Sequence, residues 1–398
     1  MEGAAYVLSR EDRPDLEEKI ESLIDDIERN QCEDGYFNIY FTVVKPEARW
    51  SCRDWHELYC AGHLMEAACA YYDVTGRDRF LNIMEKYADY IEKVFVKEHS
   101  ASFTTPGHEE IELALIRMYR HTGKKKYLEL AAHFINARGV VEERLDSMED
   151  QSHKPVREQT EAVGHCVRAQ YMYNAMAALA AIDDEYRAKY HNALESLWND
   201  VTNTKQFVTG GVGLIAEDSF GASYELPNVA AYCETCAAIA NMMWNRRMST
   251  LYNGSRFSDQ VETDLYNAIL GCVALDGKSF FYTNYLSTLA LRNEWYDTAC
   301  CPPNLSRTLL SIGGHIYNVG ERSLWVEQYI SNDASTEIAG KAIDINMTSG
   351  FPSDGKVAIS IGADEPTEFT LYLRVPYWSR GISLKLNGEA LDATADEN

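Results

Sequence analysis

Apolar residues recur at helical spacing along most of the first 320 residues of this 398-residue chain. Behind Pro14, a residue suited to the first turn of a helix, leucines and isoleucines return every three or four positions as far as Ile27. This pattern predicts a helix over 13–31. Similar patterns predict helices over 56–72, 77–94, 162–181, 185–202, 228–247, 258–275 and 303–319, with a short extended piece over 37–41.

Two helix boundaries repeat one another. Residues 72–81 resemble residues 119–128: in each segment a helix ends at a glycine and a new helix starts with charged residues. The two glycines, Gly76 and Gly123, lie 47 residues apart, a period that suits one helical hairpin. The hairpins are too irregular for an open solenoid. We therefore predict a mainly α fold, a closed toroid of paired helices known as an (α/α)6 barrel, whose loops gather at one end.

The pattern changes after about Gly320, where apolar and polar residues alternate. Alternation with period two is typical of strands, and turn residues separate the segments. The predicted strands cover 324–326, 357–361, 369–373 and 382–386. We expect a barrel domain over 1–320 and a β-sandwich portion over 321–398. We also expect that the first helix of the barrel and part of the sandwich lie outside this sequence.

The formal net charge of −24 argues against nucleic acid and anionic membranes as partners, because both require a basic face. No apolar run reaches the length of a membrane span, and the start of the chain lacks the pattern of a signal peptide. The ten cysteines are scattered, several of them in apolar helical runs. Buried free thiols rather than disulfides are expected, which favours a reducing, cytoplasmic location.

Two short stretches carry candidate metal ligands: Glu234 and Cys236 in one, Cys300 and Cys301 in the other. Thiolates and a carboxylate are ligands that zinc accepts in tetrahedral sites. Residues two apart on a regular helix point about 200° apart, so Glu234 and Cys236 can share a metal only at a helix entry or a distorted turn. The alternatives for the cysteine pair are a vicinal disulfide or two inert thiols.

The residues that follow the cysteine pair favour the metal site. Pro302 and Pro303 suit the first turn of a helix, which places both thiols at a helix N-terminus. There the helix dipole, and zinc if it is bound, lower a thiol pKa.

Six motifs follow one another along the chain: HELYCAGH at 56–63, GHEEIELAL at 107–115, AVGH at 162–165, YELPN at 224–228, YCETC at 232–236 and CCPPN at 300–304. Together they resemble the β-L-arabinofuranosidase family, glycoside hydrolase family 127 and its close relatives. The resemblance implies an (α/α)6 barrel flanked by β-sandwiches. It also implies a retaining exo-glycosidase that releases terminal β-L-arabinofuranose or a similar pentose.

The resemblance also implies the chemistry of the site. One glutamate and three cysteines hold zinc in that family, and these map onto Glu234, Cys236, Cys300 and Cys301. The first cysteine of the pair, Cys300, is the expected nucleophile, and its attack at the anomeric carbon gives a thioglycoside.

The general acid/base departs from the family pattern, a glutamate ahead of the YxLPN motif. Counting back from that motif without a gap places Asp218 where the family has glutamate, whereas Glu217 has the expected side chain one residue out of register. Either carboxyl group could protonate a leaving oxygen. Asp218 is preferred, and Glu217 stays open.

The residues that match the family's sugar-binding positions are His56, His108, His165, Glu262 and Tyr282. The expected partner is a small-molecule or oligosaccharide substrate, and a homodimer stays open as the assembly. Two other functions remain: a non-catalytic carbohydrate-binding or structural barrel braced by zinc, and a sugar isomerase or epimerase, since helical toroids host both kinds of protein.

Overall fold

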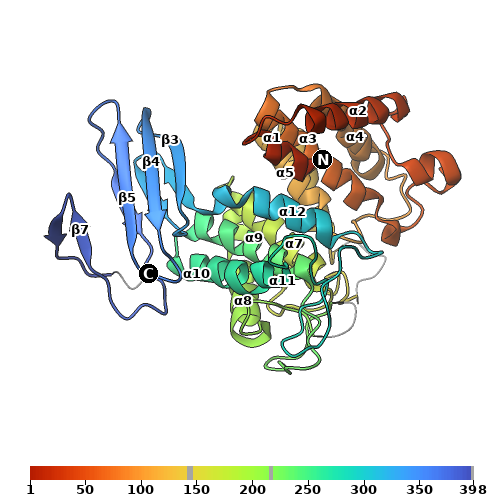
Figure 1. Cartoon of the computed structure of the whole chain (residues 1–398). Coiled ribbons are helices and arrows are strands. Elements are labelled where there is room, and N and C mark those ends of the chain that lie inside the picture. Colours follow the sequence, from red (N-terminus) through yellow and green to blue (C-terminus); the bar gives the residue numbers. More distant parts are fainter. Residues whose placement is uncertain (141–146, 215–217, 396–398) are drawn as a thin grey trace.

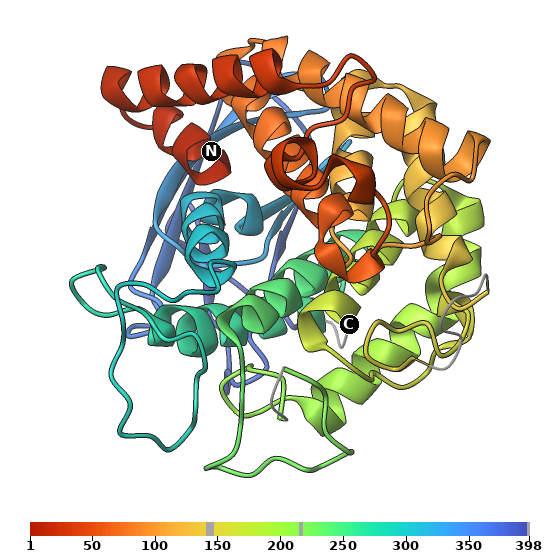
Figure 2. The same ribbon diagram turned by 90° about the vertical axis from the view of Figure 1, so that its right-hand side faces the viewer.

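The computed structural model describes residues 1–140, 147–214 and 218–395. Within these residues six helices form a closed inner ring (Figure 2). Each inner helix packs on the next, and the last packs on the first. The ring consists of α1 (Glu2–Leu8), α3 (Glu57–Thr75), α5 (Ile111–Thr122), α7 (Cys166–Ala180), α9 (Thr235–Tyr252) and α12 (Cys301–Leu310). The mainly α, toroidal fold predicted from the sequence is confirmed.

Outer helices pack on this ring from outside. They are α2 (Pro14–Asn30), α4 (Arg79–Glu92), α6 (Lys125–Ala137), α8 (Asp184–Asp200) and α10 (Ser255–Thr263), the last continuing as η7 (Asp264–Ile269) and α11 (Leu270–Cys272). Outer helices are amphipathic, as in α2, where Ile20, Ile24 and Ile27 face the barrel and are buried. Inner helices are enclosed on nearly all sides, and every residue of α7 except Arg168 is buried.

The connections make the inner helices parallel to one another. An outer helix returns the chain between successive inner helices, as in the hairpins closed by Gly76 and Gly123, both in the left-handed conformation. All inner N-termini therefore lie at one end of the ring. Five of the residues that precede these helices are polar or ionisable: His56, Glu110, His165, Glu234 and Cys300.

Strands follow the barrel. β1 (Tyr317–Gly320), β2 (Ser323–Val326) and β6 (Thr370–Leu373) form one sheet, in the order β1-β2-β6. A second sheet is the meander β3 (Asn332–Ile338), β4 (Lys341–Ser349) and β5 (Val357–Ala363), and β7 (Leu384–Leu386) pairs with β8 (Glu389–Leu391). Leu324 of the first sheet shares an apolar core with Ile343 and Ile345 of the second. The two sheets thus face each other, as the predicted β-sandwich requires.

The sheets lie beside the C-terminal end of the inner helices (Figure 1). Arg374, directly after β6, is buried and forms an ion pair with Asp259 of α10 at 2.6 Å. Asn318 of β1 donates to the Ser249 hydroxyl near the end of α9 at 3.2 Å. The opposite end of the ring, where the N-termini converge, therefore stays clear of the sheets.

Some local predictions differ from the structure. Residues 37–41 are not extended, because the chain turns there into the π-helix η1 (Tyr40–Val44). The helix predicted over 228–247 begins only at Thr235, since residues 228–233 form a loop. The predicted strands fall within or overlap observed ones, but β1, β3, β4 and β8 were not predicted. The helix predicted over 303–319 ends at Leu310, and its last three residues belong to β1. Among the described helices, none has the length and apolarity needed to cross a bilayer.

Candidate functional site

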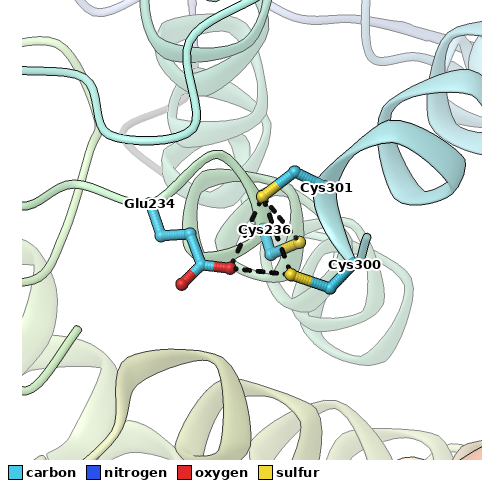
Figure 3. Close-up of side chains that lie close together, drawn as sticks. All are labelled: Glu234, Cys236, Cys300 and Cys301. Atoms are coloured by element: carbon cyan, nitrogen blue, oxygen red, sulfur yellow. Dashed lines mark hydrogen bonds between the residues drawn. The ribbon is translucent and has the colours of Figure 1, made fainter. Parts of the chain in front are cut away.

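Four candidate ligands meet where α9 and α12 begin (Figure 3). The Cys236 and Cys301 sulfurs lie 3.4 Å apart, and those of Cys300 and Cys301 lie 3.9 Å apart. Glu234 Oε1 lies 3.4 Å from Cys300 Sγ and 3.5 Å from Cys301 Sγ. Residues 65 positions apart in sequence thus converge on one point. The vicinal disulfide is wrong, because all ten cysteines are free thiols.

The backbone at both helix starts explains this convergence. Glu234 is the residue before the first turn of α9, with extended backbone, and Cys236 lies inside that turn. The two side chains can therefore point the same way despite their spacing of two. A short bridge between Glu234 and Thr283, with the Thr235 amide donating to the Tyr282 carbonyl at 2.9 Å, fixes this entry. Cys300 takes the equivalent place before α12, whose first turn contains prolines.

The donor set fits zinc. A tetrahedral site with bonds of about 2.3 Å to sulfur separates its ligand atoms by about 3.8 Å, close to the distances observed here. One oxygen and three sulfurs are donors that structural and catalytic zinc sites use. The four ligand atoms all lie within 4.8 Å of one another. The cluster can therefore hold a metal ion.

Electrostatics single out Cys300 among the sulfurs. Hydrogen bonds with the Cys236 and Cys301 thiols lower the pKa of Cys300 well below its ordinary value, with further help from the Tyr282 hydroxyl 3.0 Å away. Burial raises the pKa of Cys236 and of Cys301. Because Cys300 also lies at a helix N-terminus, negative charge in the cluster gathers on its sulfur.

The three predicted sugar-binding histidines form a row beside the cluster. The ring centroids of His56 and His108 are 6.0 Å apart, and those of His108 and His165 are 5.8 Å apart. Burial, followed by the charge of Arg168, lowers the pKa of His165 to about 3. Burial and the neighbouring His165 lower that of His108. Neutral imidazoles can both donate to and accept from sugar hydroxyls.

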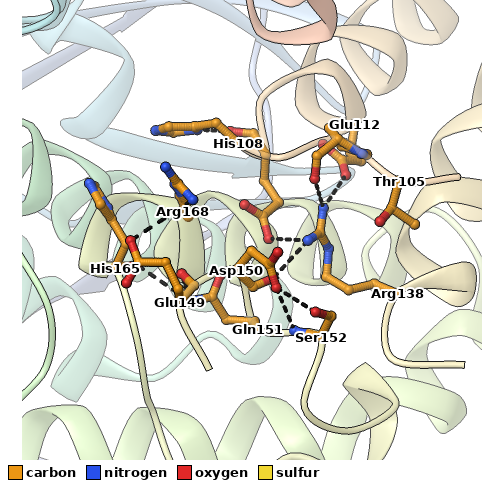
Figure 4. A network of polar contacts seen from close by, with 12 residues as sticks. Thr105, His108, Glu112, Arg138, Glu149, Asp150, Gln151, Ser152, His165 and Arg168 are labelled. Atoms are coloured by element: carbon orange, nitrogen blue, oxygen red, sulfur yellow. Dashed lines mark hydrogen bonds and ion pairs between the residues drawn. The ribbon is translucent and has the colours of Figure 1, made fainter. Parts of the chain in front are cut away.

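A buried polar network supports these histidines (Figure 4). Arg138, fully buried, donates to the carbonyls of Pro106 and Asp150, each at 2.7 Å. It also forms an ion pair with Glu109 at 3.1 Å, next to His108. Gln151 then donates to the Val163 carbonyl at 2.9 Å, close to His165. The loops that carry both histidines are therefore tied to one guanidinium.

Asp218 lies between the histidines and the cluster. Its side chain is fully buried, and the Glu234 amide donates to its Oδ1 at 3.4 Å. Its Oδ2 has no hydrogen-bond partner among the described residues. Burial and the Glu234 carboxylate raise its pKa well above the usual range. The alternative, Glu217, lies outside the described residues.

Of the other two predicted sugar-binding residues, one lies at the site and one does not. Tyr282 is at the site, in contact with Cys300. Glu262 is not: it accepts from Trp378 Nε1 at 2.8 Å and pairs with Arg374, at the junction between α10 and the segment after β6. The sequence analysis missed Arg168, which lies beside the histidines. Arg168 follows His165 by three residues on a predicted helix, and this spacing indicates that the two side chains are neighbours on the helix surface.

A cavity of about 630 Å³ opens beside Cys300. Its wall includes Tyr59 and His63 of α3, Phe37 and Asn38. This volume accommodates a small sugar with a linked group. Apolar and aromatic residues make up most of this wall, and His56, His108 and His165 are not among its lining residues, so Cys300 borders the hollow on a different side from the histidines.

This chain is similar to known proteins of one family of glycoside hydrolases. The family profile described as beta-L-arabinofuranosidase, GH127 catalytic domain, matches residues 1–314, and the profile of the GH127 middle domain matches residues 323–398. A curated relative, the non-reducing end beta-L-arabinofuranosidase of Bifidobacterium longum subsp. longum, is 32% identical over 98% of this chain. The chain spans 65% of the length of that relative.

Solved structures give similar matches. A GH127 beta-L-arabinofuranosidase from Geobacillus stearothermophilus T6 superposes with a TM-score of 0.94 and 42% identity, over 98% of this chain and 66% of that chain. Another GH127 beta-arabinofuranosidase gives a TM-score of 0.91 and 36% identity, over 99% and 66%. The similarity covers both the helical ring and the strands.

Proposed function

Because the chain belongs to the β-L-arabinofuranosidase family, glycoside hydrolase family 127, we propose that it is a retaining exo-glycosidase. Its substrate is a terminal β-L-arabinofuranoside or a similar pentoside within a small molecule or oligosaccharide. The observation that carries this proposal is the convergence of Cys300 with Glu234, Cys236 and Cys301 at one point, beside a cavity and next to the row of three histidines. The free state of all ten cysteines supports a reducing, cytoplasmic location.

In the first step the Cys300 thiolate attacks the anomeric carbon while the bond to the leaving oxygen breaks. Asp218, kept protonated by its raised pKa, donates its proton to that oxygen. The product is a thioglycoside on Cys300 and a free alcohol. His56, His108 and His165 hold the sugar hydroxyls, and Tyr282 holds the sulfur in position.

In the second step water attacks the same carbon from the face that the leaving group vacated. The Asp218 carboxylate takes a proton from this water, and the carbon–sulfur bond breaks to regenerate the thiolate. Two inversions at one carbon give overall retention of configuration.

Zinc fits the ligand set of Glu234, Cys236, Cys300 and Cys301, and when bound it supplies a positive charge that stabilises thiolates. The residues themselves orient the reaction. Cys300 is the only member of the set that also contacts Tyr282 and lines the cavity, which leaves Cys236 and Cys301 as buried supports.

The test is hydrolysis of 4-nitrophenyl β-L-arabinofuranoside by the wild type and by Cys300→Ser. We expect the variant to lose about 10⁴-fold or more in kcat, as is usual when a nucleophile is removed. Mass spectrometry of a quenched reaction should find a pentosyl adduct on the peptide that contains residue 300.

Cys52→Ser is the matched control, since Cys52 is a free thiol that lies outside the cluster. It should retain wild-type turnover. Full activity in Cys300→Ser would contradict the assignment of the nucleophile. A folded, zinc-loaded wild type that hydrolyses no glycoside would favour a bracing metal in a non-catalytic barrel.

Metal removal gives an independent prediction. The ligands join α9 to α12, so zinc binds the folded state and should stabilise it. A strong chelator should lower the melting temperature of the wild type by several degrees, and elemental analysis should find about one zinc per chain. In Cys236→Ser the chelator should change little. Identical melts with and without chelator in the wild type would count against the site.

A further inference from the structure

A second cavity, of about 420 Å³, lies at the other end of the inner ring. Its lining residues come mainly from the C-terminal halves of α5, α9 and α12. Along α9, Arg247 is eleven residues after the cluster ligand Cys236, a rise of about 16 Å. The cavity therefore lies away from the cysteine cluster, and the paired side chains of Glu2 and Arg307 stand between it and the cavity beside Cys300 and line both.

Arginines dominate the wall of this cavity. Five of them line it: Arg117, Arg120, Arg246, Arg247 and Arg307. The carboxylates among the lining residues are Glu2 and Glu66. In a chain with a formal net charge of −24, this local excess of positive charge runs against the rest of the molecule.

The carboxylates neutralise only part of that charge. Arg117 pairs with Glu2 at 3.2 Å and with Glu66, and Arg307 pairs with Glu2 at 3.1 Å. Among the described residues, the other three arginines form no ion pair. In the described part of the chain, three guanidinium groups thus share one hollow with no carboxylate within ion-pair distance, and Glu66 and Glu327 act on them only from further away.

Hydrogen bonds to uncharged groups account for two of the three. Arg246 donates to the carbonyls of Gly314 and Tyr317 at 2.8 and 2.9 Å. Arg247 donates to the Asn174 side chain at 2.8 Å and to the Met243 carbonyl at 3.3 Å. Arg120 has no such explanation, because it makes no hydrogen bond to any described residue although it lines the cavity.

Two observations indicate that this charge is costly as it stands. Burial lowers the pKa of Arg247 to about 10, and the nearby charge of Arg120 contributes. The two ring nitrogens of His315, which also lines the cavity, are buried and find no partner in the described part of the chain. An anion in the hollow would satisfy these groups together.

We propose that this cavity binds a small oxyanion, a phosphate or carboxylate group on a molecule of monosaccharide size or smaller. Guanidinium groups match the paired oxygens of both anions with two parallel hydrogen bonds. A neutral His315 adds one more N–H donor. Arg120 is exposed to solvent, so an anion can reach it without unfolding of the barrel. This binding is separate from the proposed hydrolysis.

Isothermal titration calorimetry of the zinc-loaded protein with inorganic phosphate tests the proposal, with sodium acetate as the carboxylate probe and sodium chloride at equal ionic strength as the reference. We expect saturable heat with phosphate, acetate or both, and none with chloride. Arg120→Gln should weaken binding by about tenfold, the usual effect of losing a hydrogen bond to a charged group. It should leave hydrolysis of the aryl glycoside unchanged.

Arg157→Gln is the matched control, since Arg157 is an exposed surface arginine paired with its neighbour Glu158. It removes the same charge far from the cavity and should bind the anion as the wild type does. Arg247→Gln provides a second cavity variant with the same expected loss. The proposal is overturned if neither phosphate nor acetate gives more heat than chloride, or if both cavity variants bind as tightly as Arg157→Gln.

Discussion

At the scale of single residues, position before a helix governs the chemistry. Glu234 and Cys300 each occupy the last non-helical place before an inner helix, where the helix dipole favours negative charge. For Cys300 the sequence predicts this entry, because Pro302 and Pro303 suit the first turn of a helix. For Glu234 the entry was expected only if it shares a metal with Cys236, since residues two apart on a regular helix diverge. Asp218 differs, since its environment rather than its position keeps it protonated.

Asp218→Asn tests that role. Losing the proton donor should lower kcat by about 10² to 10⁴-fold for an alkyl β-L-arabinofuranoside, whose leaving oxygen needs protonation. For a dinitrophenyl glycoside, whose leaving group departs unaided, the first step should be nearly unchanged, visible as a burst of dinitrophenolate. Glu217→Gln is the control and should keep wild-type rates on both substrates. Equal losses on both substrates in Asp218→Asn would instead indicate a structural role.

Two positions, Glu262 and Arg168, show where reasoning from the sequence went astray. Glu262 matches a family position, yet its partner Arg374 comes from a segment 112 residues away. The pairing depends on how the sheets dock against α10, which local patterns do not encode. Arg168 was missed for a different reason: a lone arginine on an apolar helix has many ordinary uses. Only the three-dimensional structure shows that its side chain lies beside the histidines.

At the scale of elements, a glycine fixes the entry of α7. Gly164 has φ of +72°, and a Cβ built on it would lie 1.9 Å from the Met148 carbonyl oxygen. The His165 amide donates to the Glu149 carbonyl at 3.1 Å in the same place. The loop at 147–152 is therefore packed directly against the start of α7, and the position of His165 depends on that contact.

Gly164→Ala should accordingly destabilise the protein by about 3 kcal/mol or more and raise KM, because strain and a backbone clash combine. Gly123→Ala is the control: its φ is +67°, but nothing lies within 4 Å of the added Cβ. It should cost only about 1 kcal/mol, with KM unchanged. Urea unfolding and steady-state kinetics measure both effects. Equal losses in the two variants would show that packing against Met148 is unimportant.

Hydrophobic periodicity predicted the outer helices accurately but missed some of the strands. Outer helices such as α2 and α4 have a clear apolar stripe, and their predicted ranges match the observed ones to within two residues. In β4 the buried residues Ile343, Ile345 and Met347 alternate as a strand requires, but its partner β3 is rich in polar residues. Pairing with β4, rather than its own composition, makes β3 a strand.

At the scale of the whole molecule, buried neutral histidines link stability to pH. Burial lowers the pKa of His63, His165 and His315 to about 3, and lowers that of His108 well below its ordinary 6.5. Between these values and 6.5 the unfolded chain binds more protons than the folded one. The contribution of these histidines to stability is therefore complete above about pH 6.5 and is lost as the pH falls below it. Buried carboxyl groups such as Glu109, whose pKa burial raises to about 8, change stability in the opposite direction as the pH rises.

Urea unfolding of the wild type and a histidine variant between pH 5 and 8 isolates this contribution as the difference between their two pH profiles. His315→Asn removes one titrating group remote from the cysteine cluster, so the slope of unfolding free energy against pH should decrease by about one proton below pH 6.5. His99→Asn is the control, since His99 is an exposed histidine on the surface, and its slope should match the wild type. An unchanged slope in His315→Asn would contradict the assignment.

The closure of the inner ring has a consequence for how the protein is made. Glu2 of α1 pairs with Arg307 of α12, 305 residues later, so the first and last inner helices meet only when nearly all of the barrel has been translated. Such long-range closure slows folding and leaves helix faces uncovered on the ribosome. The four proposed metal ligands lie at the starts of α9 and α12, so their site is likewise completed only after α12 has been made, and a nascent chain released before α12 would carry an open ring.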